Sequence, residues 1–168
     1  QFGQARADAR FNRATKGLYE MGSTFKVLNT AIALETGAAD INHRFDVGKP
    51  MRISRFTITD YKPRNRPLNV PEIMVYSSNI GSARIAEEIG AETQRSYMDK
   101  LGLLERPTLE LTETAQPLYP ARWGRLSSYT ISFGHGISVS PIHVAGAVSA
   151  AAGTGEFIAP TLLKRKPD

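Results

Sequence analysis

A serine and a lysine near the start of the chain have the types and the spacing that nucleophilic catalysis uses. Ser23 and Lys26 are three residues apart in the run Ser23-Thr24-Phe25-Lys26, so in a helix their side chains lie on one face. A serine becomes a nucleophile when a base takes its proton, and a neutral lysine amine is such a base. The ordinary pKa of lysine is about 10.4, so burial or a second cation must lower the pKa by roughly three units for half of the amines to be free at pH 7. The preceding Gly22 permits a tight turn that leaves the Ser23 amide at a helix N-terminus, where a developing oxyanion is stabilised.

Taken alone, this spacing does not identify an active site. Serine and lysine are common, and one Ser-x-x-Lys is expected about as often as not in a chain of this length. The alternative is an ordinary helix start with a solvated lysine.

A second group of polar residues, Ser77-Ser78-Asn79, lies between two predicted helices. In such a turn the hydroxyl of Ser77 and the amide of Asn79 can face one cleft. The hydroxyl would relay a proton, and the amide would hold a substrate carbonyl or N–H. The alternative is that the three residues cap the second helix, which is the ordinary local use of these residue types.

The third candidate is a glycine-flanked histidine in the run Ser132-Phe133-Gly134-His135-Gly136. Two glycines around a histidine indicate a close approach of the backbone, such as the wall of a site, and a structural turn is the alternative. The three motifs gain weight together. A Ser-x-x-Lys at a helix start, a Ser-x-Asn turn 54 residues later and a Gly-His-Gly run before another helix form an ordered set.

Other chemistries find little support in the sequence. The chain contains no cysteine, which excludes disulfides, thiolate metal sites and a cysteine nucleophile. The histidines His43, His135 and His143 are scattered without an acidic partner at ligand spacing, so we expect no metal and no cofactor. The pair Glu87-Glu88 is interpreted as a solvated helix face and not as an acid–base pair.

The charge balance is basic. The chain has 21 Lys and Arg residues against 16 Asp and Glu, a formal charge of +5, which permits attraction to anionic partners without identifying one. The basic residues Lys62, Arg64 and Arg66 and the run Lys164-Arg165-Lys166 lack interleaved aromatic residues or a recognised module, so we expect no nucleic-acid partner. At a cell envelope the same charges would favour anionic lipid or wall polymers.

A mostly helical chain must position these candidates. The 168 residues fit one domain, and a hydrophobic content of 41% supports a packed core. Apolar residues at three- and four-residue steps, with capping residues beside them, predict helices over 23–35, 92–101 and 141–152. Two more are predicted between them: a short helix that starts at Asn69 and Pro71, and a second helix that Gly90 ends. We expect one or two short strands between 45 and 59, an exposed basic loop over 61–67 and a long irregular connection over 105–124.

Neither a membrane-spanning stretch nor a targeting segment is recognisable in the sequence. No stretch approaches the 18 or more apolar residues of a membrane helix. The start, Gln1-Phe2-Gly3-Gln4-Ala5-Arg6, has neither an initiator Met nor the apolar core of a signal peptide, so we expect an internal or processed starting point.

The ordered motifs resemble class B penicillin-binding proteins, and most closely the division-specific (septal) branch of these peptidoglycan D,D-transpeptidases. The similarity extends from about Ala9 to Leu163. It is carried by Tyr19-Glu20-Met21-Gly22-Ser23-Thr24-Phe25-Lys26, Ser77-Ser78-Asn79-Ile80-Gly81 and Ser132-Phe133-Gly134-His135-Gly136-Ile137-Ser138-Val139-Ser140-Pro141, with support from Ala9-Arg10-Phe11-Asn12-Arg13, Gly48-Lys49-Pro50-Met51 and Phe56-Thr57-Ile58-Thr59-Asp60.

The resemblance implies a fold and a reaction. The fold would be the helical part of the α/β transpeptidase (serine β-lactamase-like) fold, with most of the central sheet missing. Ser23 would attack the carbonyl of the penultimate D-Ala of a stem peptide, expel the terminal D-Ala and become an acyl-enzyme, while Lys26 takes the Ser23 proton. Ser77 would pass a proton towards the leaving amine, and Asn79 would hold the substrate amide. An amine from a neighbouring stem peptide then accepts the acyl group.

The same resemblance implies ligands, partners and a location. Gly22, Ser78, Gly134, His135 and Gly136 would contribute to substrate binding. β-Lactams would acylate Ser23 as mimics of the D-Ala-D-Ala end. The parent protein would act at the periplasmic face of the bacterial inner membrane with membrane proteins of the division complex.

Two departures from the family pattern concern residue types. Met21 stands where Pro is usual, and we expect little consequence because Pro mainly fixes φ. The third motif of the family, Lys-[Ser/Thr]-Gly, is absent: Lys164-Arg165-Lys166, Thr15-Lys16-Gly17 and Gly153-Thr154-Gly155 do not fit it.

We therefore expect residues 1–168 to be a partial transpeptidase domain that lacks the Lys-Ser/Thr-Gly strand, the membrane anchor and the amino-terminal domain. In the family that lysine helps to bind the substrate carboxylate and to depress the pKa of Lys26, and the strand supplies half of the oxyanion hole. The expectation that follows is little or no transpeptidase activity for this chain alone.

Two alternatives stay open. One is a β-lactam-hydrolysing or β-lactam-sensing relative. Class A β-lactamases need a Glu that activates water, and Glu110 and Glu113 lie in a plausible stretch, although their surroundings differ from that family's loop. The other is a non-catalytic binding module, in which Ser23 would be dispensable.

Overall fold

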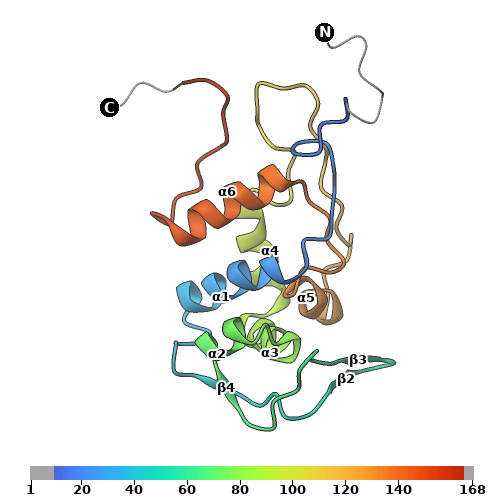
Figure 1. The fold of residues 1–168 in the computed structure, drawn as a ribbon, viewed down its shortest axis with the longest axis vertical. Helices are drawn as coiled ribbons and strands as arrows, with labels where there is room; N and C mark the ends of the chain where they lie inside the picture. The colour runs from blue at the N-terminus through green and yellow to red at the C-terminus, as the bar shows by residue number, and fades with distance from the viewer. Residues whose placement is uncertain (1–9, 165–168) are drawn as a thin grey trace.

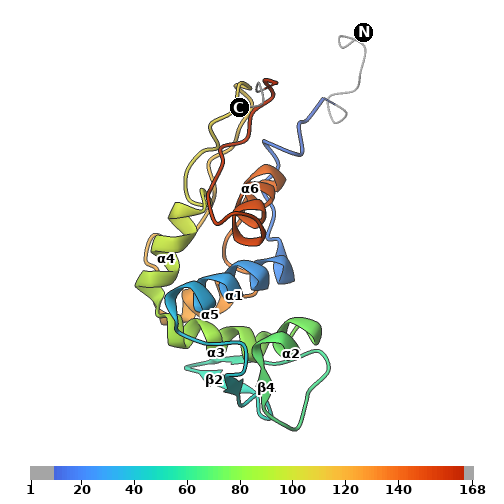
Figure 2. The same cartoon turned by 90° about the vertical axis from the view of Figure 1, so that its left-hand side faces the viewer.

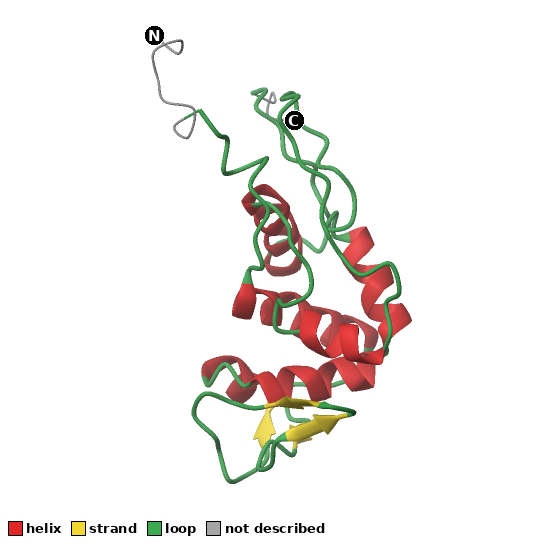
Figure 3. Cartoon of the chain, turned by 90° about the vertical axis from the view of Figure 1, so that its right-hand side faces the viewer, coloured by secondary structure: helices red, strands yellow, loops and turns green. Residues whose placement is uncertain are grey.

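The computed structural model describes residues 10–164. Its helices and strands, in chain order, are α1 (Phe25–Thr36), β1 (Arg44–Phe45), β2 (Met51–Ile53), β3 (Phe56–Ile58), β4 (Leu68–Asn69), α2 (Val70–Val75), α3 (Asn79–Ile89), α4 (Ala91–Lys100), α5 (Arg125–Ile131) and α6 (Pro141–Ala152). Helix α1 runs through the middle, with α6 on one side and α3 on the other (Figure 1). From the side, the short strands lie at one end of an elongated molecule (Figure 2), and long loops fill the other end (Figure 3). The prediction of a mostly helical chain with little sheet is confirmed.

Helix α1 is the centre of the core. It follows a 3₁₀ turn over Gly22–Thr24 and buries the apolar side chains that recur along one stripe, Phe25, Leu28, Ile32 and Ala33. Gly37 ends the helix in the left-handed conformation, with φ 70°. The helix predicted over 23–35 is thus confirmed, with its first turn tightened.

Two consecutive helices carry the second motif. Asn69 and Glu72 form a reciprocal capping box that starts α2, with Pro71 in its first turn. The chain leaves α2 through Ser77, and the Ser78 side chain caps α3 by accepting a hydrogen bond from Gly81 N–H at 2.8 Å. The predicted capping use of this serine-rich turn is therefore confirmed for Ser78.

Helix α5 was missed by the sequence reasoning, which left residues 125–131 without an assigned element. It is only seven residues long, begins at Gly124 without a side-chain cap, and alternates apolar residues with Ser127, Ser128 and Thr130. The helix forms because Tyr129 and Ile131 are buried in the core. Tertiary packing, which short polar segments do not reveal, decides this element.

The strands form two small antiparallel pairs. β2 pairs with β3 as a hairpin, with Met51 opposite Ile58, and β1 pairs with β4, with Phe45 opposite Leu68. The hairpin confirms the short strands expected over 45–59, whereas β4 lies beyond that range. Across the part of the chain that the structure describes, these two pairs are the only sheets.

The long connection over 105–124 is tied to the segment that leads into Ser23. The backbones of Leu118 and Ser138 exchange two hydrogen bonds of 2.9 and 2.8 Å, and those of Tyr19 and Val139 exchange two of 2.9 and 3.1 Å. Three distant stretches thus lie side by side and fix the approach to α1.

Among residues 10–164, no helix has the length and apolar character that a membrane crossing needs. The start at residues 1–6, Ala9 and most of the basic run at 164–166 lie outside the described residues.

Candidate active site

Ser23, Ser77 and Lys26 are joined by hydrogen bonds. The Ser77 hydroxyl donates to Ser23 Oγ at 3.1 Å, and Lys26 Nζ donates to Ser77 Oγ at 2.9 Å and to the Ser77 carbonyl at 2.5 Å. Ser77 has φ 52°, in the left-handed region that is uncommon for residues other than glycine. This conformation turns both its hydroxyl and its carbonyl to the lysine. Ser77 therefore stands between the predicted nucleophile and the predicted base.

The two ends of this row differ in exposure. Ser23 is exposed, whereas Lys26 is 2% exposed. Burial lowers the pKa of Lys26 from 10.5 to about 8, and the negative charge of Asp60 opposes that shift. A lysine with this pKa has a free amine in a useful fraction of molecules near neutral pH. The arrangement has an accessible hydroxyl and a sheltered base.

Asn79 opens onto a groove beside this row. It is the first residue of α3, and its side-chain amide donates to the Thr59 carbonyl at 3.3 Å. The groove has a volume of about 500 Å³. Strand β3, Thr59, Asn79 and His135 line it, together with four residues in or next to α5: Leu126, Ser127, Thr130 and Phe133. Because the amide nitrogen of Asn79 is engaged, its Oδ1 is the atom available to accept a hydrogen bond from a ligand N–H.

Ser78 lies behind the site and not in it. Its side chain is 1% exposed, it donates to Asp60 Oδ2 at 2.6 Å, and it accepts from Gly81 N–H. Its hydroxyl is fully engaged within the protein. The sequence-based assignment of Ser78 to substrate binding therefore lacks a geometric basis, and the structure gives this residue a supporting position.

The glycines of the first and third motifs pack against each other. Gly134 is buried with φ 78°, and a Cβ there would lie 2.1 Å from the Gly22 carbonyl oxygen. Gly22 N–H in turn donates to the Gly134 carbonyl at 3.3 Å. This contact leaves no room for a side chain and fixes the turn that precedes Ser23. The close backbone approach predicted for the Gly-His-Gly run is thus observed.

The other two residues of that run face outward. Gly136 has φ 78°, and its N–H donates to a Glu20 carboxylate oxygen at 2.8 Å. His135 is exposed and packs its ring on Phe133 at the groove, with 5.5 Å between ring centroids. The structure therefore brings His135 and Asn79 to the same groove, whereas Gly136 shapes the loop.

Sequence reasoning did not identify Thr59, Asp60 or Glu20 as site residues. The only sequence signal for them is their position: Thr59 and Asp60 are polar residues that follow a strand, and Glu20 is a polar residue just before the Ser23 motif. Their partners lie between 18 and 116 residues away in the chain. Such distant pairings are not encoded in local spacing.

A buried polar network lies beneath the site. The Gln94 side-chain amide donates to Asn29 Oδ1 and to the Ser128 carbonyl, both at 3.1 Å, and accepts from Trp123 Nε1 at 3.1 Å. Asn29 donates in turn to the Ser82 carbonyl at 3.1 Å. This network connects α1, α3, α4 and α5, so it sets the helix that carries Lys26 against the helix that carries Asn79.

The remaining titratable candidates have structural partners. Glu87 accepts from Tyr129 at 2.8 Å and from Arg84 at 3.1 Å, and it pairs with Arg125. The interpretation of Glu87 as a merely solvated residue was therefore wrong, whereas Glu88 is exposed. Across the described 10–164 range, no group of three or more His, Cys, Asp or Glu side chains is placed to hold a metal ion.

The glutamates of the β-lactamase alternative lie away from the groove. Glu110 accepts from the Thr161 hydroxyl and from Leu162 N–H at 2.8 Å, and the Glu113 carbonyl accepts from Thr15 at 2.6 Å. Neither residue lines the groove beside Asn79.

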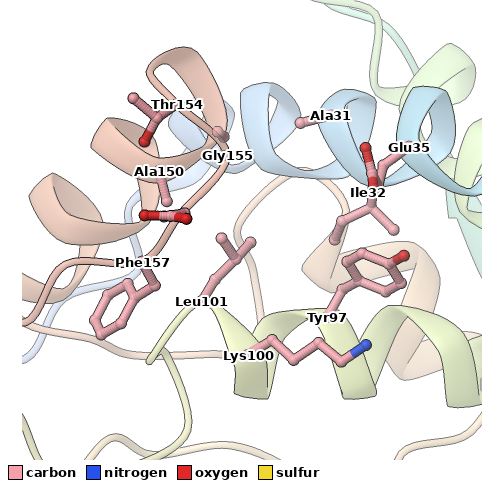
Figure 4. A pocket seen from close by; sticks show the side chains of 12 residues that line it. Ala31, Ile32, Glu35, Tyr97, Lys100, Leu101, Ala150, Thr154, Gly155 and Phe157 are labelled. Carbon is pink, nitrogen blue, oxygen red and sulfur yellow. The ribbon is translucent and has the colours of Figure 1, made fainter.

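A second pocket, of about 470 Å³, lies between α1, α4 and the end of α6 (Figure 4). Its apolar walls include Ile32, Leu101 and Phe157, and its polar groups include Glu35, Lys100 and Glu156. None of the three sequence motifs contributes to it. The candidate catalytic residues therefore lie at the Ser23 end of α1 and do not line this pocket.

Comparison with known proteins supports the motif-based resemblance. The family model described as the penicillin binding protein transpeptidase domain matches residues 3–168. The chain is 41% identical over 165 residues to the probable peptidoglycan D,D-transpeptidase FtsI of Caulobacter vibrioides, covering 98% of this chain and 28% of that protein. It is 33% identical over 150 residues to the probable peptidoglycan D,D-transpeptidase PenA of Neisseria gonorrhoeae, covering 88% of this chain and 26% of that protein.

Solved structures agree. The apo transpeptidase domain of penicillin-binding protein 3 from Burkholderia pseudomallei superposes with a TM-score of 0.87 at 29% identity, covering 95% of this chain and 48% of that one. A structure described as a peptidoglycan glycosyltransferase from Burkholderia ambifaria gives a TM-score of 0.88 at 29% identity, covering 95% and 51%. The chain spans about a quarter of the length of the curated relatives it matches. On its motifs, its fold and these similarities, the chain belongs to the penicillin-binding protein transpeptidase domain family.

Proposed function

We propose that this chain supplies the nucleophile, the base and the Ser-x-Asn element of a peptidoglycan D,D-transpeptidase that works through an acyl-serine intermediate in septal wall synthesis. The observation that carries the proposal is the hydrogen-bonded row from exposed Ser23 through Ser77 to buried Lys26. The relatives named as D,D-transpeptidases supply the reaction class.

Acylation begins when Ser23 Oγ attacks the carbonyl carbon of the penultimate D-Ala. With Lys26 neutral, both hydrogen bonds run in the opposite direction, so the Ser23 proton passes to Ser77 Oγ while the Ser77 proton passes to Lys26 Nζ, across the 3.1 and 2.9 Å separations. With a pKa of about 8, roughly a tenth of the Lys26 amines are free at pH 7. The amide C–N bond then breaks, and the departing D-Ala nitrogen takes a proton back through Ser77.

The second half of the reaction reverses this proton path. The amine of a neighbouring stem peptide attacks the ester carbonyl, and its proton leaves through Ser77 to Lys26. A new amide bond forms, and Ser23 Oγ recovers a proton as it departs. A β-lactam follows the first half only: Ser23 opens the ring amide, no separate leaving group departs, and the ester persists.

Asn79 and the groove orient the substrate. The free Asn79 Oδ1 accepts a backbone N–H of the stem peptide, while Phe133 and the hairpin residue Thr57 flank the chain in the groove. The Ser23 amide, in the 3₁₀ turn that leads into α1, supplies one donor to the developing oxyanion.

The remaining parts of the proposal concern the whole protein. Cross-linking of the wall places the parent protein at the periplasmic face of the inner membrane, with division-complex membrane proteins as partners. The 168 residues contain no Lys-Ser/Thr-Gly sequence, so we expect residues 1–168 alone, as a partial transpeptidase domain, to react slowly or not at all.

The test measures D-Ala release and cross-linked product from a stem pentapeptide and an acceptor amine, using the intact protein. Ser23→Ala should abolish both, and Ser96→Ala, at an exposed serine of α4, should leave both unchanged. Rapid hydrolysis of a penicillin without cross-linking would instead establish the β-lactamase alternative. Full cellular function of Ser23→Ala would establish the non-catalytic one.

A further inference from the structure

The Asp60 carboxylate holds the turn formed by residues 77–79 through two hydrogen bonds. One of its carboxylate oxygens accepts from the Ser78 hydroxyl at 2.6 Å, and the other accepts from Ile80 N–H at 3.0 Å. These two partners flank Asn79 on either side. Charge-assisted hydrogen bonds of this kind are short and about twice as strong as neutral ones. The carboxylate therefore holds the Ser78 side chain on one edge of Asn79 and the Ile80 backbone on the other.

The preceding residue holds the side chain of the same asparagine. The Thr59 carbonyl accepts from the Asn79 amide at 3.3 Å. Two consecutive residues, Thr59 and Asp60, thus fix both the backbone and the side-chain orientation of Asn79. Both follow β3 directly, so the β2–β3 hairpin is the support from which they act.

The turn needs support because Ser77 has a backbone conformation that is unfavourable for a residue with a side chain. Its φ of 52° directs its carbonyl and its hydroxyl to Lys26 Nζ. Such a conformation persists only where the surrounding structure holds it. Ser78, the next residue in the chain, is the one that Asp60 holds.

We propose that Asp60 is a positioning residue for the acylation of Ser23: it locks the 77–79 turn in its reactive conformation. The inference rests on the proposed function, because it assigns Asp60 a part in that reaction. It goes further by naming a carboxylate that touches neither the nucleophile nor the groove.

The electrostatic part follows from what surrounds Lys26. The 77–79 turn presents neutral groups to the amine, Ser77 Oγ and the Ser77 carbonyl. The negative charge of Asp60 raises the pKa of Lys26, which burial lowers. Removal of the Asp60 charge therefore lowers the pKa of Lys26 further. More of the amine is then free at a given pH.

The alternative is that Asp60 only stabilises the start of α3, as acidic residues near helix N-termini commonly do. A purely structural role would change the melting temperature without moving the pH dependence of Ser23 acylation. Two variants separate the two functions of the carboxylate. Asp60→Asn removes the charge but keeps an acceptor, whereas Asp60→Ala removes both.

The experiment measures the rate of Ser23 acylation by a fluorescent penicillin from pH 5.5 to 9.5, in the intact protein. Asp60→Asn should move the midpoint of the profile to lower pH. Asp60→Ala should reduce the plateau rate by about 10- to 100-fold, because the reacting groups lose alignment. Asp99→Asn, which removes a charge from the exposed face of α4, should match the wild-type profile.

A full plateau rate in Asp60→Ala would overturn the inference while leaving the proposed function intact. Absence of Ser23-dependent labelling in the wild type would overturn both. Thermal unfolding of each variant accompanies the rates. If Asp60→Ala does not fold, the plateau rate of Asp60→Asn decides: it should fall below the wild-type rate, because asparagine keeps one of the two acceptors that hold Ser78 and Ile80.

Discussion

At the scale of single residues, the candidate site combines an exposed serine with a buried lysine. Ser23 is exposed and is linked to Lys26 by hydrogen bonds through Ser77, whereas Lys26 is 2% exposed, so the proposed nucleophile is accessible to a ligand while the amine is shielded from water. Burial lowers the pKa of that amine to about 8. A buried lysine is unfavourable for stability and useful for proton transfer.

Lys26→Arg tests the base directly. Arginine stays charged and cannot take a proton, so the rate of Ser23 acylation should fall by about 100-fold or more. Stopped-flow measurement with a chromogenic β-lactam checks this in the intact protein, and melting temperatures exclude unfolding. Lys100→Arg, an exposed position on α4, is the matched control. A Lys26→Arg rate equal to that of the control would mean that Lys26 is not the base.

At the scale of elements, the site is where three backbone segments meet: the turn before α1, the 77–79 turn between α2 and α3, and the glycine run after α5. Only the first two were recognisable as helix boundaries from sequence. Pairings such as Ser77 with Lys26, which are 51 residues apart, and Gly134 with Gly22 depend on helix packing and have no local signature.

Gly134→Ala tests the contact between these segments. A Cβ at Gly134 would lie 2.1 Å from the Gly22 carbonyl oxygen, so the variant should lose about 2–4 kcal/mol of unfolding free energy and most of its Ser23 reactivity. Gly155→Ala is the control, since Gly155 also has a positive φ (86°) but open space around it. Equal losses in the two variants, measured by urea unfolding, would show that backbone strain alone and not the contact is responsible.

The start of α6 contains a pH-dependent element. His143 is 3% exposed, and its Nδ1 lies 3.2 Å from Ser140 N and 2.6 Å from Ser140 Oγ, while Nε2 lies 3.0 Å from the Glu105 carbonyl. This arrangement suits the neutral ring, with Nδ1 accepting and Nε2–H donating. Burial lowers the pKa of His143 below 6.5.

Because the folded pKa of His143 is depressed, the unfolded chain binds a proton at a higher pH than the folded protein. The free energy of unfolding should therefore fall as the pH drops below about 6.5, and the loss should continue until the folded pKa is passed. Urea unfolding between pH 7.5 and 5.0 measures the slope. His143→Gln should flatten it in this window, and His43→Gln, an exposed position, should not. Identical slopes in wild type and His143→Gln would contradict the assignment.

At the scale of the whole molecule, a helical core holds the motifs and a small hairpin supports them from one end. Sequence periodicity predicted α1, α2, α3, α4 and α6 because their caps and apolar stripes are local. It missed α5, because the polar residues of this short helix obscure the apolar pattern of its buried side, and it did not predict the pairing of β1 with β4. The nucleophile, the base and the Ser-x-Asn turn could be predicted as candidates, whereas the supporting roles of Ser78 and Asp60 required the structure.

The buried hydrogen-bond network around Gln94 connects helices α1, α3, α4 and α5. Gln94→Ala removes the donor to Asn29 and to the Ser128 carbonyl and the acceptor of Trp123, leaving buried polar groups without partners. We expect a loss of about 2–4 kcal/mol in unfolding free energy. Ser96→Ala, on the exposed face of the same helix, should change it by less than about 0.5 kcal/mol. A Gln94→Ala variant as stable as Ser96→Ala would show that the network contributes nothing net.

The central claim is that Ser23 is the nucleophile of a transpeptidase site whose base is reached through Ser77. The most direct test treats the intact protein with a penicillin and locates the covalent adduct by peptide mass spectrometry. A long-lived ester should form on the peptide that contains Ser23, be absent in Ser23→Ala and form slowly in Ser77→Ala. An adduct on another residue, or rapid formation of the Ser23 ester in Ser77→Ala, would contradict it.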